Sequence, residues 1–544
     1  MKQKVFYLSI FVSLTCLLSA GAQNHTFTRQ DSLRGSITPE REWWDLIAYR
    51  LQVKPDIKKQ SLRGWNWVVF KPIDSTKRMQ IDLQPPMQID EVKYKNAPLH
   101  YDRDGNVYWL NFEDNLALHQ LDSIQIFFSG KPKISASPPW DGGLTWTKDD
   151  KQMDFIATSV QGEGASLWWP CKDHMYDEVE RMDIYLDIPK PLFGVANGRL
   201  VETEELTESN IYHWQVKNPI NNYGVNMNIG NYVQFHEVYS GLKGKLDLDY
   251  FVLEQDLSKA KKQFKQVPKM LDAFEYWFGP YPFYEDSFKL VQVPYLGMEH
   301  QSSVTYGNGF QNGYRGYDLS GTGWGLKFDF IIIHEAGHEW FANNITNRDI
   351  ADMWIHESFT AYSESLYLEY YFGKEAGQEY VRGTRSNILN DSPIISNYNV
   401  NQSGSGDMYY KGANMLNTIR TWLNDDILWR SILTGLNKDF YHQTVSTEQI
   451  EEYIIQKTNL PLKELFEQYL KTTDVPQLDV KLSDKEMYFR YFKTVPNFSM
   501  PLNIVINGEK VKISPNSKWQ KMTFDQKIEE FDVDPNYYIR ISIK

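Results

Sequence analysis

His334-Glu335-Ala336-Gly337-His338 is the stretch that indicates the fold of the middle part of this 544-residue chain. Residues four positions apart share one face of a helix, so His334 and His338 can direct their imidazoles at one metal ion. Glu335 is rotated by about 100° from His334, which places it beside the metal. A carboxylate in that place can take a proton from water. The spacing predicts a helix that carries two metal ligands and a general base.

Glu357, nineteen residues after His338, completes the set. Two histidines and a glutamate are the ligands of catalytic zinc sites that keep one position open for water. We therefore expect one zinc ion on His334, His338 and Glu357. Zinc lowers the pKa of water and polarises a carbonyl group, and peptide hydrolysis needs both effects. The spacing alone identifies neither the substrate nor the donor that stabilises the oxyanion.

The composition is that of a globular protein with several domains, because 42% of the residues are hydrophobic and 23% are charged. The formal net charge of −13 argues against a nucleic-acid partner, which would need a basic patch. No stretch is apolar for long enough to predict a transmembrane helix. The sequence leaves the oligomeric state open.

Residues 1–22 have the features of a secretory signal peptide. Lys2 and Lys4 precede an apolar stretch over residues 5–18, and Ala20-Gly21-Ala22 is a small-residue cleavage site. Cleavage there would change the formal charge to −13 − 2 = −15. It would leave Cys171 as the only cysteine, which excludes an internal disulfide. We expect an exported protein that is periplasmic or secreted.

The rest of the chain predicts three domains and a multidomain α+β fold. Residues 23–245 are rich in β-formers and turn residues such as Asp104-Gly105, so we expect an all-β domain with one short helix over residues 40–51. Residues 246–475 are mostly helical in their spacing. Residues 476–544 return to short strands, with turns such as Asn507-Gly508, and predict a small β domain.

The predicted middle domain begins with a helix over residues 257–278, in which Pro268 would introduce a kink. A long surface loop is expected over residues 306–325, which contain seven glycines. The metal-binding helix is expected over residues 328–344 and the helix with Glu357 over residues 355–372. Further helices are expected over residues 376–390, 408–424 and 447–470.

Several motifs make the chain resemble the M1-family zinc aminopeptidases, which are gluzincins. The matching segments, in chain order, are Gln161 with residues 168–171 and Asp173 (Q-x-E and PC-x-D), 296–300 (GAMEN), 334–343 (HExxHxWFGN), 354–359 (WLNEGF) and 409–413 (YEKGA). These segments follow the family's order and cover roughly residues 40–475. The resemblance implies a thermolysin-like fold for the mostly helical domain and peptide substrates with a free N-terminus.

The resemblance also implies a role for two residues beside the metal. Glu299 would bind the α-amino group of the peptide, and a carboxylate suits this because an ammonium group needs a charge-assisted hydrogen bond. Tyr409 would donate its phenol to the oxyanion. The adjacent Tyr410 is the competing candidate, although alignment on Lys411-Gly412 favours Tyr409.

Three further residues are implied as substrate contacts. Gln161 would line the pocket for the first side chain, while Gly297 and Met298 would shape the backbone beside the substrate. Only about seventy residues follow Val475, so we expect a short form without the long C-terminal helical domain of larger members. Such a form would have a more open cleft.

Two histidines depart from the family motifs. His300 stands where GAMEN has Asn, and His356 replaces the Asn before Glu357. We expect His300 to titrate near neutral pH and to weaken amine binding when it is charged. Asp352 is either a hydrogen-bond partner of a ligand histidine or an ordinary carboxylate at a helix N-terminus.

Two alternative functions stay open. A zinc endopeptidase would share the metal site, but an amine anchor at Glu299 is useless to an enzyme that cuts within a chain. An exported binding protein on an inactive peptidase scaffold would have no reason to retain Glu335 and Tyr409 together with all three ligands. The sequence does not predict which N-terminal residue is preferred.

Overall fold

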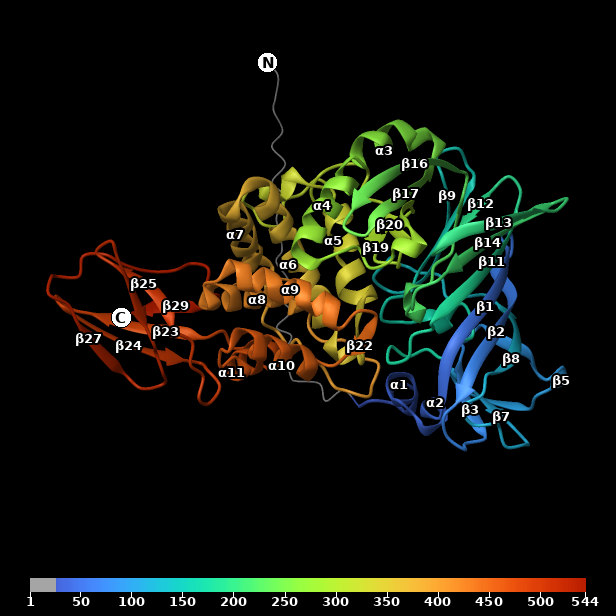
Figure 1. Cartoon of the computed structure of the whole chain (residues 1–544), viewed down its shortest axis with the longest axis horizontal. Coiled ribbons are helices and arrows are strands. Elements are labelled where there is room, and N and C mark those ends of the chain that lie inside the picture. Colours follow the sequence, from blue (N-terminus) through green and yellow to red (C-terminus); the bar gives the residue numbers. More distant parts are fainter. Residues whose placement is uncertain (1–25) are drawn as a thin grey trace, which may run out of the picture.

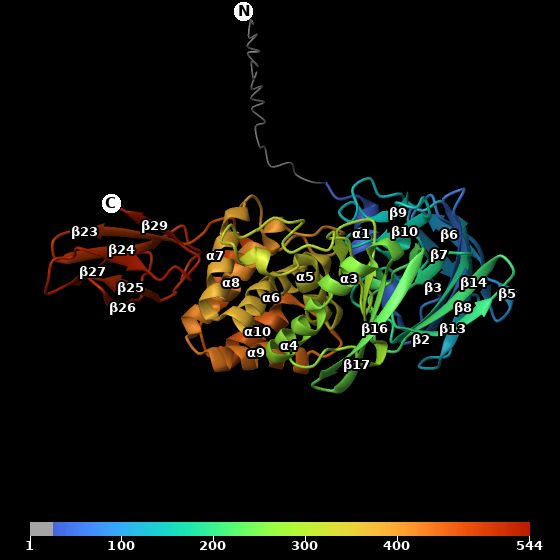
Figure 2. The same cartoon turned by 90° about the horizontal axis from the view of Figure 1, so that it is seen from above.

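The computed structural model describes residues 26–544, which form three parts in a row (Figures 1 and 2). A β-rich N-terminal part lies at one end, a mostly helical part lies in the middle, and a small β-rich C-terminal part lies at the other end. This order confirms the predicted multidomain α+β fold. The predicted signal peptide lies outside the described residues. Within residues 26–544, no helix combines the length and apolarity needed to cross a membrane.

An eight-stranded sheet organises the N-terminal part, with the order β13-β14-β11-β1-β2-β8-β4-β5. Its strands are β1 (Trp44–Asp56), β2 (Ser61–Pro72), β4 (Gln88–Tyr94), β5 (Ala97–Pro98), β8 (Asp122–Gly130), β11 (Arg181–Pro189), β13 (Arg199–Glu205) and β14 (Ser209–Val216). Alternate residues of β1 point into the core, so Leu51 and Val53 are fully buried.

β1 corrects the expectation of a helix over residues 40–51. Only α2 (Pro39–Glu42) is helical there, and Trp44 already belongs to the strand. β1 pairs in parallel with β11 and antiparallel with β2. Pairing on both sides requires an extended backbone, and it outweighs the local helical spacing of these residues. A further short helix, α1 (Arg29–Gly35), packs Leu33 against β7 (Val107–Asn111).

Two smaller sheets complete the N-terminal part, with the orders β12-β15-β10-β9 and β3-β7-β6. Their other strands are β3 (Arg78–Asp82), β6 (Tyr101–Asp104), β9 (Gly143–Lys148), β10 (Asp154–Ser159), β12 (Phe193–Val195) and β15 (Asn228–Gly230). Asp104-Gly105 forms the turn between β6 and β7, as predicted. β10 ends two residues before Gln161, so this sheet carries Gln161 towards the middle part.

A mixed five-stranded sheet leads into the helices, with the order β16-β17-β18-β20-β19. Its strands are β16 (Tyr232–Gly241), β17 (Gly244–Leu253), β18 (Phe288–Gln292), β19 (Gly297–Met298) and β20 (Val304–Tyr306). The predicted domain boundary at residues 245 and 246 falls inside β17, which pairs with β16 along its whole length. β19 is an edge strand. It contains Gly297 and Met298, the two residues of the GAMEN-like segment that are expected to shape the backbone beside the substrate.

The helices of the middle part pack around one large core. They are α3 (Leu257–Gln263), α4 (Gln266–Phe278), α5 (Phe330–Gly337), α6 (Trp354–Phe372), α7 (Lys374–Gly383), α8 (Tyr410–Leu423), α9 (Asp426–Asp439), α10 (Thr447–Thr458) and α11 (Lys463–Lys471). A short parallel pair, β21 (Ile345–Asn347) and β22 (Gln443–Val445), lies among them.

Several helices differ from the predictions. The expected helix over residues 257–278 is interrupted at residues 264–265 and forms α3 and α4. Pro268 lies in the first turn of α4, where a missing N–H has no helical partner to lose. The expected helix over residues 447–470 is two helices, because Asn459 ends α10 in the left-handed conformation and Pro461 follows. α9 was not predicted, although Trp429, Leu433 and Leu436 have helical spacing.

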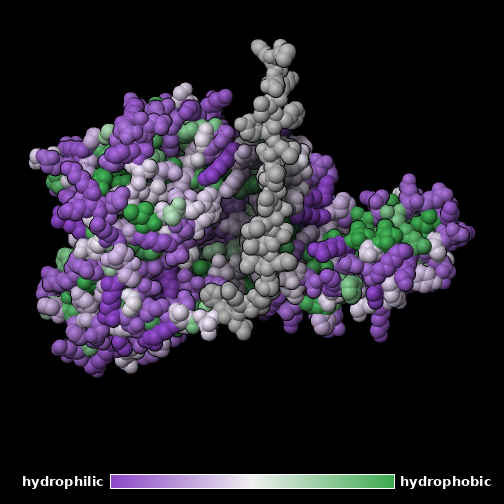
Figure 3. Space-filling view, turned by 180° about the vertical axis from the view of Figure 1, so that it is seen from behind, coloured by the Kyte–Doolittle hydropathy of each residue, from purple (hydrophilic) through white to green (hydrophobic). Residues whose placement is uncertain are grey.

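The C-terminal part consists of two sheets, with the orders β27-β24-β23-β29 and β26-β25-β28. Its strands are β23 (Gln477–Leu482), β24 (Glu486–Phe492), β25 (Leu502–Ile506), β26 (Glu509–Ile513), β27 (Gln520–Thr523), β28 (Phe531–Val533) and β29 (Arg540–Ile543). Asn507-Gly508 forms the predicted turn, with positive φ at both residues. The backbone N–H of Tyr538 donates to Thr418 Oγ1 at 2.9 Å and ties this part to α8. Figure 3 shows that the C-terminal part presents an apolar patch on one face.

Candidate metal centre

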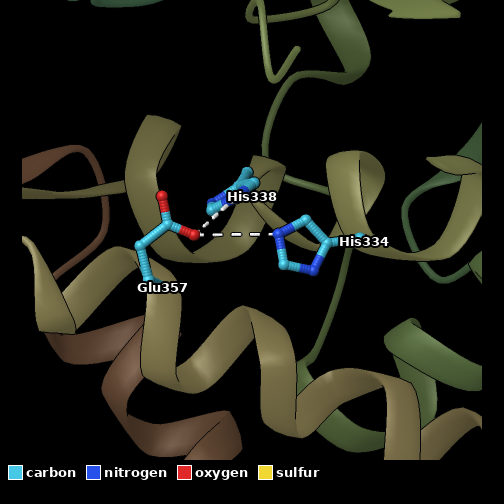
Figure 4. Close-up of side chains that lie close together, drawn as sticks. All are labelled: His334, His338 and Glu357. Atoms are coloured by element: carbon cyan, nitrogen blue, oxygen red, sulfur yellow. Dashed lines mark ion pairs between the residues drawn. The ribbon is translucent and has the colours of Figure 1, made fainter. Parts of the chain in front are cut away.

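α5 and α6 bring the three predicted ligands together (Figure 4). His334 lies in α5, His338 follows its last residue, and Glu357 lies in the first turn of α6. Glu357 Oε2 lies 3.7 Å from His334 Nε2 and 3.4 Å from His338 Nε2. All three side chains are buried, and one ligand atom from each lies within 4.8 Å of the others.

Other groups hold the second ring nitrogen of each histidine. His334 Nδ1 lies 2.7 Å from Glu364 Oε1, and the other oxygen of Glu364 accepts the hydroxyl proton of Tyr380. His338 Nδ1 lies 3.1 Å from the Phe341 carbonyl oxygen. A proton on each Nδ1 leaves the Nε2 lone pairs directed at Glu357, and this tautomer is the one that binds a metal.

A zinc ion fits this set of donors. Glu357 Oε2 is buried between the two imidazoles and has no hydrogen-bond partner among the described residues. A buried carboxylate oxygen without a partner is costly. A divalent cation between the three side chains would satisfy this oxygen and both Nε2 lone pairs at once. His334, His338 and Glu357 are therefore the residues that would hold the ion.

Burial and mutual charge set the ionisation of the two glutamates. Burial raises the pKa of Glu335 to about 7, against the opposing charge of His334. Burial also opposes ionisation of Glu357, but the adjacent His338 and His334 lower its pKa overall. Glu357 therefore stays ionised as a ligand must, and Glu335 titrates in the range that suits a general base.

α5 ends at Gly337, although the prediction extended it to residue 344. Phe341 and Ala342 have non-helical backbone angles. The irregular segment turns the Phe341 carbonyl towards His338, where it accepts the proton of the ring. The Phe341 carbonyl thus contacts the imidazole of His338 and does not continue the helix. Hydrophobic spacing along the sequence gives no signal for such a contact.

Glu299 directly follows β19 and lies beside Glu335 and His338. A carboxylate oxygen of Glu299 lies within 4.8 Å of a ligand atom from each of those residues. Gln161 donates its amide to Glu299 Oε1 and, at 3.2 Å, to Glu357 Oε1. Asn343 Nδ2 donates to the Glu299 carbonyl oxygen at 2.9 Å. The fold therefore places Gln161, Glu299 and the metal ligands in one cluster.

Tyr409 faces the ligands from the segment that enters α8. Its ring stacks on the ring of His334, with the centroids 5.9 Å apart. Burial, followed by the charge of Glu357, raises the pKa of Tyr409 well above its ordinary value, so the phenol keeps its proton. Gly412 lets α8 approach α6 closely, because a Cβ at this position would overlap the side chain of Ser358.

One expectation about residues near the site is corrected, for His300, and the alternative of an ordinary carboxylate near a helix N-terminus holds for Asp352. His300 is fully buried and burial lowers its pKa to about 3, so it stays neutral at neutral pH. Asp352 accepts the hydroxyl protons of Thr447 at 2.7 Å and Tyr398 at 2.6 Å, and it contacts no ligand histidine. His356, the other departure, is also buried and accepts the backbone N–H of Asn347 at 2.8 Å.

Two residues of the site were not predicted. Glu364, and not Asp352, is the hydrogen-bond partner of a ligand histidine. It lies seven residues after Glu357 on the same face of α6. That spacing is a signal in the sequence. Tyr223 is buried in the N-terminal part, and its pKa is raised first by burial and then by the charges of Glu299 and Glu357. Nothing local in the sequence distinguishes this tyrosine from the other 33.

Residues 262–469 match the domain described as "Peptidase family M1 domain". The matched segment includes both histidines, Glu335, Glu357, Glu299 and Tyr409. The middle part thus contains a segment that is similar to family M1 peptidase domains (the M1 domain). Gln161 lies outside the matched M1 segment, in the β-rich part that precedes it.

Curated relatives of this chain are distant in sequence and longer. "Probable aminopeptidase 1" of Sulfurisphaera tokodaii is 19% identical over 516 residues, which cover 90% of this chain and 62% of the relative. "Tricorn protease-interacting factor F2" of Thermoplasma acidophilum is 19% identical, over 79% of this chain and 55% of the relative. The chain thus spans about half to three fifths of the length of these relatives.

Solved structures share the fold of this chain. A mutant M1 zinc metallopeptidase of Deinococcus radiodurans, bound to a Tyr-Ser-Ala substrate, has a TM-score of 0.67 at 17% identity. The superposition covers 81% of this chain and 98% of that chain. Another structure of the Deinococcus metallopeptidase has a TM-score of 0.66, also at 17% identity. At this identity the likeness establishes the fold alone.

Proposed function

We propose that this protein is a zinc-dependent aminopeptidase that removes the N-terminal residue of peptides. One observation carries the proposal: the Glu299 carboxylate lies within the same 4.8 Å cluster as Glu335 and His338. A carboxylate held there can bind the ammonium group of a free N-terminus through charge-assisted hydrogen bonds. The first peptide bond of that substrate would then lie beside Glu335 and the metal ligands.

In the proposed mechanism, His334, His338 and Glu357 would hold a single zinc ion, which when bound would supply a Lewis acid for water and the carbonyl group. Glu335 takes the proton from the attacking water and later passes it to the leaving amine. Tyr409 donates its phenol to the developing oxyanion. Glu299 anchors the α-amino group, and Gln161 orients Glu299 through its side-chain amide.

The edge strand β19 supports binding of an extended peptide. β19 pairs with β20 on one side only, so its other side has no strand partner among the described residues. An extended peptide can pair with such an edge. Gly297 and Met298 supply this edge, in agreement with the role that the family resemblance implies for them.

The amine anchor distinguishes the proposal from a zinc endopeptidase. We expect hydrolysis of an alanine peptide with a free N-terminus and a loss of at least about a hundredfold in kcat/KM for its N-acetylated form, because Glu299 then has no ammonium partner. Equal rates on the two peptides would favour an endopeptidase. Steady-state kinetics with the two matched peptides provides the measurement.

Glu335→Gln tests whether the domain is a working enzyme or an inactive scaffold. The variant keeps the size of the side chain and removes the base, so kcat should fall by about 10²–10⁴ while zinc stays bound. Zinc content is measured by elemental analysis of the same samples. Zinc retained with unchanged turnover would refute the role of Glu335.

We also propose that the protein is exported, on the basis of residues 1–22. Expression of the full chain in a bacterial host, followed by N-terminal sequencing of the mature protein, tests this. A mature protein that starts near Gln23 supports export with cleavage after Ala22. Recovery of the chain with its first 22 residues intact would contradict it.

A further inference from the structure

The hydroxyl of Tyr223 is a buried polar group that the proposed mechanism does not use. Tyr223 lies in η2 (Asn222–Gly224), a short helical turn of the N-terminal part, and is 4% exposed. Its hydroxyl has no partner in hydrogen-bond geometry among the described residues. A buried hydroxyl without a partner costs free energy, so its presence in the fold requires an explanation.

The side chain of Asn197 ties the Tyr223 segment to the segment that follows Glu299. Its amide donates to the Gly224 carbonyl oxygen at 2.7 Å and to the Gln301 carbonyl oxygen at 2.8 Å. The side chain of Gln301 donates in turn to a backbone carbonyl oxygen of the N-terminal part at 2.8 Å. These buried hydrogen bonds fix the backbone of Tyr223 relative to the backbone of Glu299.

Gly224, the last residue of η2, packs against a residue that holds Glu299. A Cβ on Gly224 would lie 3.9 Å from Asn343 Oδ1, which is ordinary van der Waals contact. The amide nitrogen of the same Asn343 donates to the Glu299 carbonyl oxygen at 2.9 Å. Tyr223 also belongs to the same hydrophobic cluster as Met298, the residue before Glu299. η2 therefore lies next to the proposed amine anchor.

The Glu299 carboxylate is the acceptor within reach of the Tyr223 hydroxyl. Burial is the first cause of the raised pKa of Tyr223, and the charges of Glu299 and Glu357 and a side-chain interaction with Glu299 add to it. The hydroxyl therefore keeps its proton and can donate it. A carboxylate accepts about four hydrogen bonds. Among the described residues, only Gln161 donates to this carboxylate in hydrogen-bond geometry, so it can accept a phenol and an ammonium group as well.

We propose that Tyr223 is a positioning residue of the amine anchor, and that its hydroxyl donates to the Glu299 carboxylate when the N-terminus of a peptide is bound. The inference rests on the proposed aminopeptidase function and adds a second residue of the N-terminal part to its substrate site. Burial disfavours the charged form of Glu299, which is 2% exposed. Hydrogen bonds from Gln161 and Tyr223 stabilise the anion and orient it, so that the ammonium group meets a charged carboxylate.

Binding of matched peptides to an inactive parent variant tests this role. The parent is the zinc-loaded protein with Glu335→Gln, which lacks the proposed base and can bind a peptide without cleaving it. Calorimetric titration measures Kd for an alanine peptide with a free N-terminus and for its N-acetylated form. Adding Tyr223→Phe should raise Kd for the free peptide by about tenfold, because a donor to a charged group is lost. Kd for the acetylated peptide should stay unchanged, since that peptide has no ammonium group to meet Glu299.

Tyr212→Phe is the matched control. Tyr212 is also 4% exposed and lies in the N-terminal part, but its hydroxyl donates to the Leu192 carbonyl oxygen at 3.3 Å. This variant should leave both Kd values unchanged. Thermal unfolding gives a second readout. Tyr223→Phe removes a buried hydroxyl that has no partner in the free protein, so the Tm should not fall below that of the parent.

The outcomes separate the role of Tyr223 from the function on which it rests. A parent that binds the free peptide more tightly, with a preference that Tyr223→Phe leaves unchanged, overturns the positioning role alone. A lower Tm together with an equal rise of both Kd values also overturns it, because a disturbed fold would weaken both peptides. A parent that binds the two peptides equally shows that Glu299 is no amine anchor, and the proposed aminopeptidase function then fails as well.

Discussion

Gln161 donates its side-chain amide to Glu299 although 138 residues separate them in the sequence. Gln161 comes from the N-terminal β-rich part and Glu299 from the edge strand of the middle sheet. The same amide lies 3.2 Å from Glu357 Oε1, so one residue contacts both the proposed amine anchor and a metal ligand. The N-terminal part therefore contributes directly to the site of the M1 domain.

Gln161→Met should weaken substrate binding more than turnover. The change keeps a similar shape but removes the donor that holds Glu299, and a hydrogen bond to a charged group contributes about 1.5–3 kcal/mol. We expect KM for an alanine amide to rise by at least about tenfold with a smaller change in kcat. An unchanged KM would show that Glu299 is held without Gln161. Steady-state kinetics at saturating zinc is the measurement.

Glu364→Gln should lower the affinity for zinc. Glu364 holds Nδ1 of His334, and loss of such a contact costs about 10–100-fold in metal affinity. Competition with a chelator of known affinity measures the change without relying on activity. Glu369→Gln is the control on the same helix, because Glu369 pairs with Arg420 at 2.7 Å and has no contact with the ligands. Equal zinc affinities in both variants would contradict the role of Glu364.

Gly412→Ala should disturb both stability and catalysis. The added methyl group would overlap Ser358, which follows Glu357, and would push α8 and the preceding Tyr409 away from α6. Overpacking of this kind costs about 1–3 kcal/mol, and kcat should fall with it. Adding Ser358→Gly to Gly412→Ala should restore part of the lost stability and part of the lost kcat. Gly406→Ala is the matched control, since a Cβ there meets no atom within 4 Å. Thermal unfolding and steady-state kinetics of the wild type and these three variants provide the measurement.

His300→Asn should make the protein less sensitive to acid. Burial holds the pKa of His300 at about 3, whereas an unfolded histidine has a pKa of about 6.5. Below pH 6.5 the unfolded chain binds a proton that the folded chain excludes, so this histidine reduces stability progressively as the pH falls. Between pH 7.5 and pH 5 the wild-type Tm should therefore fall by a few degrees more than the Tm of the variant. Parallel Tm profiles would show that His300 becomes protonated in the folded protein.

Much of the metal centre could be predicted from local spacing. His334, Glu335 and His338 lie on one helix, and their geometry follows from the helical repeat alone. Glu357 and Tyr409 could be named through short motifs whose residues are also close in sequence. The turns at Asp104-Gly105 and Asn507-Gly508 were predicted for the same reason, because few residue pairs adopt the required backbone.

The errors lie where distant contacts outweigh local spacing. The segment from Trp44 is a strand because β2 and β11 pair with it. α5 ends early because the Phe341 carbonyl contacts the ring of His338. His300 does not titrate near neutral pH because the fold buries it completely, a property that its neighbours in the sequence do not reveal.

The sequence by itself predicted the candidate metal ligands and the candidate base, since His334, Glu335 and His338 lie within about one helical turn and Glu357 follows in a short motif. Only the tertiary structure decided that Gln161 reaches Glu299, that Glu364 holds His334, and that the segment of Tyr223 packs beside Asn343. These contacts join segments from different sheets and helices. Their partners are set by packing, and no local periodicity encodes packing between distant segments.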